Sequence, residues 1–296
     1  MREATIICRL SSRNGLAYYR RLQEELPKRG LAIVEAHMVQ SRRQLQKRVR
    51  QAVKSGKTLI VVIGGDGSQT AAVAEMAHSD SVLAVVPAGT GNSFALSLGI
   101  KADIDETIET IANGKELRVD LGIVNDTYFA NFATIGLIAE AAKRTDKPLK
   151  RIVGPIAYGI SVIAPIFRRK PFEMLVKWPG NDLKIVTYQA IVASGRYFGW
   201  QPLTPHADIR SGELAFFAAE GGTPADAMAT NAALVSGEQT KLENAHYFSA
   251  PKISIKTKPK QPLNIDGHPL GKTPAKFRIA RKALRVLVPA DFEDKV

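Results

Sequence analysis

Two uninterrupted apolar runs constrain the fold of this chain more than any other feature: LIVVI at 59–63 and VLAVV at 82–86. Neither run alternates with polar residues, which is typical of a strand buried on both faces in the centre of a parallel sheet. Each run ends in glycines and is followed by a helix-like segment. Because strand and helix patterns alternate over 1–115, the sequence predicts a doubly wound α/β domain whose ligands bind at the carboxyl ends of the strands.

The segments around these runs complete the alternation of strands and helices. Ser41 is a favoured N-cap, apolar residues follow it every four positions, and Gly56 suits a helix end. The patterns predict strands at 4–10 and 32–39 and helices at 15–29 and 41–56. Basic residues line the second helix, and we interpret them as a solvated face, with a phosphate- or membrane-facing surface as the alternative: Arg42, Arg43, Lys47, Arg48, Arg50 and Lys54.

The pattern changes near residue 118. Two strand-like runs flank Asn125-Asp126, which is typical of a hairpin, and a helical, proline-interrupted region follows at 136–170. Beyond it, β-like runs, most of them separated by turn residues, continue toward the end of the chain. The last two, AKFRIA at 275–280 and ALRVLVP at 283–289, are expected as separate strands. The sequence therefore predicts an α/β domain at 1–118 and a second, mainly antiparallel β-rich domain at 119–296, whose last run could return to either domain.

The composition is that of an ordinary globular protein, with 296 residues, of which 45% are hydrophobic and 23% charged. Cys8 is the single cysteine, so an internal disulfide is impossible, and we expect it to pack as a small hydrophobe in a reducing compartment. The sequence shows neither a signal-peptide pattern nor a run of about 20 apolar residues that could cross a bilayer. These features predict a cytoplasmic protein.

The formal net charge of +13 favours anionic partners. Zinc-finger spacings, aromatic RNA-binding motifs and basic low-complexity tails do not accompany the charge, so nucleic acid is not an expected partner. The charge favours a phosphorylated ligand or an anionic membrane surface, to which the protein would bind peripherally at the inner membrane face. A generally basic cytoplasmic protein is the plainer alternative. No feature of the sequence specifies an oligomeric state.

The glycines after the two apolar runs suit phosphate. Gly64-Gly65-Asp66-Gly67 precedes a helix-like segment that begins near Ser68, and the segment 87–92 repeats this layout. Glycines let a ligand approach the backbone, and helix N-termini offer N–H groups and a positive dipole end. In a parallel sheet both loops would emerge at one edge and could hold one polyphosphate. A single GGDG loop could be only a turn, but two such loops with an embedded carboxylate favour magnesium coordination or hydroxyl binding by Asp66.

These loops match neither the lysine-containing phosphate loop nor the dinucleotide-binding fingerprint. GGDGS at 64–68 and PAGTGNSFALSLGI at 87–100 instead resemble the paired signatures of diacylglycerol-kinase-type lipid kinases, a group that includes sphingosine and ceramide kinases and bacterial relatives. NAD kinases are similar at the first loop only. Further matches to the lipid kinases follow in order at 119–124, 128–136, 196–214, 264–270 and 283–289, so the resemblance covers nearly the whole chain.

The resemblance implies a nucleotide-binding α/β domain, a β-rich lipid-binding domain, and transfer of the γ-phosphoryl group of ATP to a lipid hydroxyl with magnesium. Asp66 would lie beside the phosphates and bind the metal. Asp266 matches the general base that takes the proton of the hydroxyl, although an Asp-Gly pair is also a common turn. The ATP phosphates would be held by Gly64, Gly65, Asp66, Gly67, Ser68, Gly89, Thr90, Gly91 and Asn92.

The chain departs from this family pattern at several positions. The first loop is RLSSRNG, where Arg9 or Arg13 is either a phosphate contact or a surface charge. Slots that are usually acidic hold neutral or basic residues: Ala71, Ser93, Arg210, Ser211 and His268. Three hypotheses remain open: an active kinase for a lipid such as diacylglycerol or a sphingoid base, a non-catalytic nucleotide- or lipid-binding relative, and a small-molecule kinase nearer to NAD kinase.

Overall fold

The computed structural model describes residues 2–139, 169–198, 201–202 and 208–293. The chain divides into two compact units, residues 1–121 with 281–296, and residues 122–280. The chain passes from one unit to the other within two strands, β5 (Lys115–Val124) and β18 (Ala275–Val288). Most of the helical region expected at 136–170 lies outside the described residues.

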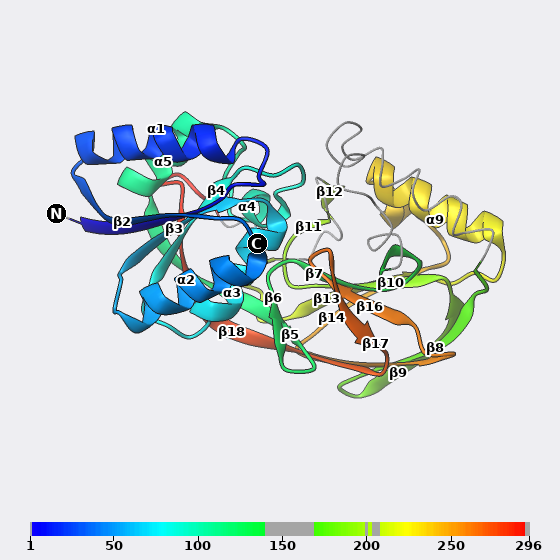
Figure 1. The fold of residues 1–296 in the computed structure, drawn as a ribbon. Helices are drawn as coiled ribbons and strands as arrows, with labels where there is room; N and C mark the ends of the chain where they lie inside the picture. The colour runs from blue at the N-terminus through cyan, green and yellow to red at the C-terminus, as the bar shows by residue number, and fades with distance from the viewer. Residues whose placement is uncertain (1, 140–168, 199–200, 203–207, 294–296) are drawn as a thin grey trace. The chain divides into compact units, whose positions relative to one another are not determined.

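The first unit contains a parallel sheet with the strand order β2-β1-β3-β4 (Figure 1). Residues 285–286 of β18 pair with β4, also in parallel. The strands β3 and β4 are buried at every position, which is why their sequences carry no polar alternation. The bounds are β1 (Arg2–Arg9), β2 (Leu31–Val39), β3 (Leu59–Gly64) and β4 (Val82–Pro87).

Helices cover both faces of this sheet, α1 and α5 on one and α2 and α3 on the other (Figure 1). The doubly wound α/β fold predicted for the N-terminal part is thereby confirmed. Ser41 caps α2 as expected, because its side chain accepts a hydrogen bond from Gln44 N, 3.2 Å away. The helices are α1 (Gly15–Lys28), α2 (Arg42–Lys54), α3 (Asp66–Met76), α4 (Ser93–Ser97) and α5 (Ile104–Asn113).

Cys8 packs inside this unit as the sequence predicted. Its side chain is fully buried between β1 and the start of α1, where Sγ donates to Gly15 O at 3.3 Å. Burial raises the pKa of the Cys8 thiol to about 11, because the thiolate would lose its hydration. Cys8 is therefore a protonated core residue.

The second unit is built from antiparallel strands in two layers, which confirms the predicted β-rich part. One layer has the order β14-β13-β10-β7-β16-β17; in the other, β15 lies between β8 and residues 275–278 of β18, and β9 follows β8. The strands are β6 (Thr127–Phe129), β7 (Phe132–Gly136), β8 (Phe172–Trp178), β9 (Asn181–Thr187), β10 (Gln189–Ala193), β11 (Tyr197–Phe198), β12 (Gln201–Pro202), β13 (Leu214–Ala219), β14 (Ala245–Ala250), β15 (Lys252–Lys258), β16 (Pro262–Ile265) and β17 (His268–Lys272).

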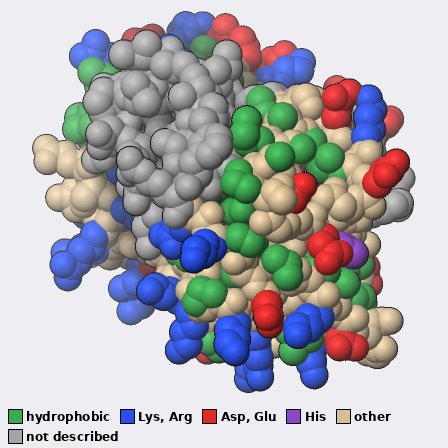
Figure 2. All heavy atoms as spheres, turned by 90° about the vertical axis from the view of Figure 1, so that its right-hand side faces the viewer, with side chains coloured by type: hydrophobic (Ala, Val, Ile, Leu, Met, Phe, Trp, Pro, Cys, Tyr) green, Lys and Arg blue, Asp and Glu red, His purple; other side chains and the backbone are tan. Residues whose placement is uncertain are grey.

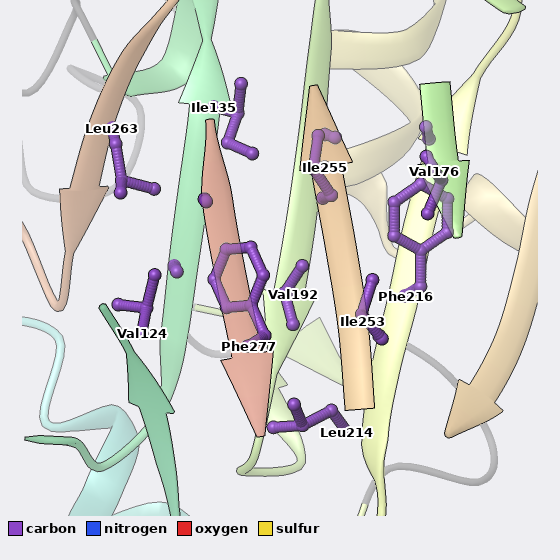
Figure 3. Packing of buried hydrophobic residues seen from close by; sticks show 14 of the residues in the cluster. Val124, Ile135, Val176, Val192, Leu214, Phe216, Ile253, Ile255, Leu263 and Phe277 are labelled. Carbon is purple, nitrogen blue, oxygen red and sulfur yellow. The ribbon is translucent and has the colours of Figure 1, made fainter. Parts of the chain in front are cut away.

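Apolar side chains from both layers fill the space between them (Figure 3). Ile135 and Leu263 come from one layer, and Ile255 and Phe277 from the other. Each strand contributes every second residue, as expected for a sheet with one face in the core. Burying a side chain of this size contributes about 1.5–3 kcal/mol, so this cluster is the main stabilising feature of the unit.

Two tight turns in this unit place residues at positive φ. Asn125 and Asp126 have φ of 45° and 67° between β5 and β6, which confirms the predicted hairpin. Asp266 and Gly267, at 44° and 83°, join β16 to β17 in the same way. Asn, Asp and Gly are the residues that tolerate this left-handed conformation best.

Two features differ from the sequence prediction. The runs AKFRIA and ALRVLVP, expected as separate strands, form the single strand β18, in which Lys282 has a φ of 52° and its N–H donates to Asp120 Oδ1 at 2.7 Å. The helix α9 (Pro224–Ser236), which precedes the 3-10 turn η1 (Gln239–Lys241), was not predicted. Its exposed positions are as apolar as its buried ones, so the sequence lacks the helical periodicity of apolar residues that would have predicted this helix.

Among the described residues, no helix has the length and apolar character needed to cross a membrane.

Candidate active site

The two glycine loops touch each other at the carboxyl edge of the parallel sheet. Gly64 at the end of β3 pairs with Pro87 at the end of β4, so both loops leave the sheet side by side, as predicted. A Cβ atom on Gly89 would lie 2.5 Å from the Cα atom of Gly65. Backbones can approach this closely only when both residues are glycine.

Asp66 lies between these loops. Its Oδ1 accepts a hydrogen bond from Phe94 N at 3.3 Å, and a Cβ on Gly91 would lie 2.9 Å from its Oδ2. The helix α3 begins at Asp66, two residues before the predicted start, because Ser68 N and Gln69 N both donate to Gly65 O. The Asp66 carboxylate therefore lies in the first turn of α3 and against the second loop.

The second loop is braced by its own asparagine. Asn92 has a φ of 54°, its Oδ1 accepts from Gly89 N at 3.0 Å, and its Nδ2 donates to Gly89 O at 3.1 Å. Both amide atoms thus hold the turn around Gly89. Thr90 is exposed at the tip of this loop, and the helix α4 that follows has five residues. The predicted contacts of Thr90 and Asn92 with phosphate stay predictions.

Two further segments reach the same edge of the sheet. Arg13 N donates to Ala88 O at 3.0 Å, which brings the segment after β1 against the second loop. Arg42, in the first turn of α2, donates from Nη1 to Gly67 O at 3.0 Å. The sequence interpretation of the α2 basic residues as a solvated face is therefore wrong for Arg42. The Ser41 cap was the signal that could have placed it, since it fixes Arg42 in the first turn of a helix that begins at this edge.

Asp266 lies in the second unit, where its carboxylate is 5% exposed. Oδ2 accepts from Ala130 N at 2.9 Å, and Oδ1 accepts from Asn131 N and Phe132 N, both at 3.0 Å. Acceptance at both oxygens is the behaviour of an ionised carboxylate. Asp266 is thus both a turn residue, as the sequence allowed, and the group that holds the β6–β7 connection. Its role as general base stays a prediction.

Two family models match the chain. The model of the diacylglycerol kinase catalytic domain matches residues 8–124. The model of the YegS C-terminal NAD kinase beta sandwich-like domain matches residues 131–288, which is more than half of the chain. The chain belongs to the diacylglycerol kinase family. The resemblance inferred from the glycine loops is thereby confirmed.

Individual relatives agree with this assignment. The diacylglycerol kinase of Staphylococcus aureus strain bovine RF122 is 31% identical over 254 residues, or 81% of this chain and 78% of that protein. The diacylglycerol kinase of Staphylococcus saprophyticus is 29% identical over 258 residues, or 83% of this chain and 81% of that protein. A crystal structure of a diacylglycerol kinase from Bacillus anthracis has a similar fold, with a TM-score of 0.75 at 18% identity over 97% of this chain and 96% of that chain.

At several positions where this family usually has acidic residues, this chain has other residues, and the structure shows where they lie. Ala71 is fully buried inside α3, Ser93 begins α4, and Arg210 N donates to Asp208 Oδ1 at 2.6 Å in a turn. In the described parts of the chain, no group of three or more His, Cys, Asp or Glu side chains could hold a metal. A magnesium ion at Asp66 would therefore take its remaining ligands from phosphate and water, as Mg²⁺ often does.

Proposed function

We propose that this member of the diacylglycerol kinase family transfers the γ-phosphoryl group of ATP to the hydroxyl of a lipid, with magnesium as cofactor. Diacylglycerol and sphingoid bases are the acceptors we consider. One observation carries the proposal: two glycine loops in backbone contact, with the carboxylate of Asp66 between them. A site for the polyphosphate and its metal needs these two elements at one place.

The residues of the first unit would position the nucleotide. The glycines of the two loops, at 64, 65, 67, 89 and 91, lack the Cβ atoms that would keep phosphates away from the backbone. The N-terminus of α3, which begins at Asp66, lies at the same place. The Arg42 guanidinium adds positive charge beside Gly67. When bound at Asp66, magnesium would neutralise charge on the phosphates. This arrangement replaces the loop lysine of other phosphate-binding proteins.

The second unit would supply the proton acceptor. Asp266 is the proposed general base, and an ionised carboxylate is the form that can take a proton from a lipid hydroxyl. Its three backbone N–H donors fix its position before the substrate binds. Phosphoryl transfer depends mostly on positioning and charge neutralisation, so one fixed base, a metal and the amide loops are sufficient.

Labelled ATP with magnesium and a panel of diacylglycerol, monoacylglycerol, sphingosine and ceramide is expected to give a labelled lipid that extracts into organic solvent. Asp266→Asn should lower this rate by about 100-fold or more, because a neutral amide cannot take the proton. Asp126→Asn is the matched control, since Asp126 occupies the same kind of turn in the same unit and its side chain is 96% exposed. Thermal unfolding of both variants verifies that they are folded.

Two other outcomes would replace the proposal. If the protein binds ATP and magnesium but phosphorylates no acceptor of the panel, it is a non-catalytic nucleotide-binding relative. If NAD is phosphorylated and no lipid is, it is a small-molecule kinase. The lipid and NAD assays and the ATP-binding measurement use the same protein preparation. A preparation that is inactive for other reasons is recognised because it does not bind ATP.

We further propose that the protein reaches its lipid at an anionic membrane surface. The net charge is +13, and Figure 2 shows Lys and Arg side chains gathered along the lower edge of one face. In the second unit, β15 and β18 direct their apolar residues into the core and their basic residues outward. These exposed basic residues are Lys252, Lys256, Lys258, Lys276 and Arg278.

Binding to vesicles that contain anionic lipid should weaken steeply with salt, because screening shortens from about 10 Å at 0.1 M to about 3 Å at 1 M. At about 1 kcal/mol for each charge, Lys252→Gln with Lys256→Gln should weaken binding by about 30-fold. The control is Lys47→Gln with Lys54→Gln on α2, which removes the same charge from the other basic segment. Equal losses for both pairs would assign the effect to net charge alone, and salt-independent binding to neutral vesicles would contradict the proposal.

A further inference from the structure

Two buried asparagine side chains near Asp266 have hydrogen-bonding atoms without a partner among the described residues. Asn131 is 1% exposed, and neither Oδ1 nor Nδ2 of its amide has a partner in the described parts of the protein. Asn264 is equally buried, and its Nδ2 lacks an acceptor there. Leaving a buried polar group without a hydrogen bond costs about 1–3 kcal/mol. Native proteins rarely retain such groups unless water or a ligand satisfies them.

The backbone of Asn131 is held firmly although its side chain is not. Asn131 N donates to Asp266 Oδ1 at 3.0 Å, and its carbonyl oxygen accepts from Ser194 N at 2.8 Å and from Gly195 N at 3.1 Å. Three segments that are far apart in the sequence therefore meet at this residue. The side chain of Asn131 therefore starts from a backbone position that is fixed next to the proposed base.

Asn264 joins the same surroundings through the sheet. It lies two residues before Asp266 and pairs with Thr134 of β7. Leu263 and Ile135 point into the core in Figure 3. Asn264 follows Leu263 in β16, and Thr134 precedes Ile135 in β7. Because successive side chains of a strand point to opposite faces, Asn264 and Thr134 lie on the other face of the six-stranded sheet. That face also carries an apolar cluster containing Ile138, Ile191, Ala193, Phe217, Ala219 and Leu234. Asn264 is thus a polar group on a largely apolar face of the sheet, which suits a molecule with an apolar body and a polar end.

We infer that Asn131, assisted by Asn264, binds the hydroxyl-bearing end of the lipid substrate and holds it beside Asp266. This inference rests on the proposed lipid kinase function. An amide suits the task because its Nδ2–H can donate to the hydroxyl oxygen while the hydroxyl proton stays available to the carboxylate. The amide is neutral, so it does not compete with Asp266 for that proton. In a sphingoid base, the amino group or the second hydroxyl would donate to Oδ1, whereas diacylglycerol has no second donor.

The structure contains a matched control for this inference. Gln189 at the start of β10 is also 1% exposed, and neither atom of its amide has a partner among the described residues. It faces the same side of the sheet, since the neighbouring Ala190 belongs to the core cluster. Gln189 lies about 16 Å along the chain from Ser194, at the rise per residue of a strand. Because Ser194 N donates to Asn131 O, Gln189 is about as far from Asn131. It lines a cavity of about 10 Å³, the size of one water molecule.

The experiment compares Asn131→Leu with Gln189→Met, two replacements that keep the approximate shape and remove the amide. Asn131→Leu should leave the melting temperature unchanged or higher, because the side chain of Asn131 makes no hydrogen bond to the described residues of the free protein. It should raise KM for the lipid by about 10-fold, the equivalent of one lost hydrogen bond, and leave KM for ATP unchanged. Gln189→Met should change neither KM. Asn264→Leu, which removes a single donor, provides a second test with a smaller expected increase.

A direct binding measurement separates this inference from the proposed function. Dioctanoylglycerol or sphingosine is titrated into the protein without ATP, and binding is followed by calorimetry. Binding to the wild type that weakens in Asn131→Leu and persists in Gln189→Met would support the inference even if no phosphate were transferred. The inference is overturned if neither lipid binds to the wild type, or if Asn131→Leu lowers the melting temperature with lipid affinity unchanged. Equal losses in both variants would also overturn it.

Discussion

Asp66→Asn should reduce phosphoryl transfer by at least about 100-fold and leave the protein folded. The side-chain oxygen that accepts from Phe94 N at 3.3 Å is retained in asparagine, so the contact between the two loops can persist. The negative charge that Asp66 places against the second glycine loop is lost. Since a carboxylate ligand holds magnesium by its charge, the proposed role of Asp66 predicts that the magnesium dependence shifts to higher concentrations.

Initial rates measured against magnesium concentration, together with calorimetry of ATP binding with and without magnesium, check this prediction. Asp80→Asn is the control, because Asp80 is an exposed carboxylate in the same unit. Its rate and magnesium dependence should match the wild type. If Asp66→Asn keeps the rate and magnesium dependence of the wild type, Asp66 is not the metal ligand, and the phosphate site must be assigned to other groups.

Gly89→Ala should weaken ATP binding and lower the rate of phosphoryl transfer by about 100-fold, the loss of rate expected when reacting groups are displaced by about 1 Å. The added Cβ would lie 2.5 Å from Gly65 Cα and 2.9 Å from Asn92 Oδ1. Because the first of these neighbours is backbone, no side-chain rotation relieves the overlap, and the two loops must separate. The backbone conformation of Gly89 itself imposes no strain, so the effect arises from space alone.

Gly222→Ala is the matched control, since a Cβ at Gly222 meets no atom within 4 Å. Calorimetry of ATP binding and thermal unfolding of both variants give the comparison. The expected result is a lost or weakened ATP signal in Gly89→Ala with a normal signal in Gly222→Ala. Wild-type ATP affinity in Gly89→Ala would show that contact between the loops is not needed to hold the phosphates.

The fold class follows from local patterns that the sequence displays. Uninterrupted apolar runs identify β3 and β4 as central parallel strands, because such strands are buried on both faces. Asn125-Asp126 marks a hairpin, and Ser41 marks a helix start, because each residue satisfies the backbone geometry or N–H groups of its own segment. These features depend on residues within a few positions of one another, so one sequence is sufficient to find them.

Local sequence patterns do not predict an element correctly where a helix lacks the helical periodicity of apolar residues, or where polar residues interrupt the apolar pattern of a strand. The helix α9 was missed because Ala225, Met228 and Val235 are exposed apolar residues that conceal its buried face. The strand β18 was divided in two because Arg281 and Lys282 interrupt its apolar pattern. Asp120, which is distant in the sequence, accepts the Lys282 N–H at the interruption.

The sequence by itself determined which residues are the candidates for binding phosphate and metal, namely the glycine loops and Asp66, because loop flexibility and charge are properties of the residues themselves. Only the tertiary structure decided how these residues are arranged. It brought the backbone of Gly65 against Gly89, placed Arg42 on Gly67, and joined Asp266 to three N–H groups more than 130 positions earlier in the chain. Hydrogen bonds between distant segments leave no periodic trace in a sequence. The three N–H groups that hold Asp266, and the Asn131 amide that lacks a partner among the described residues, could therefore be recognised only in the folded protein.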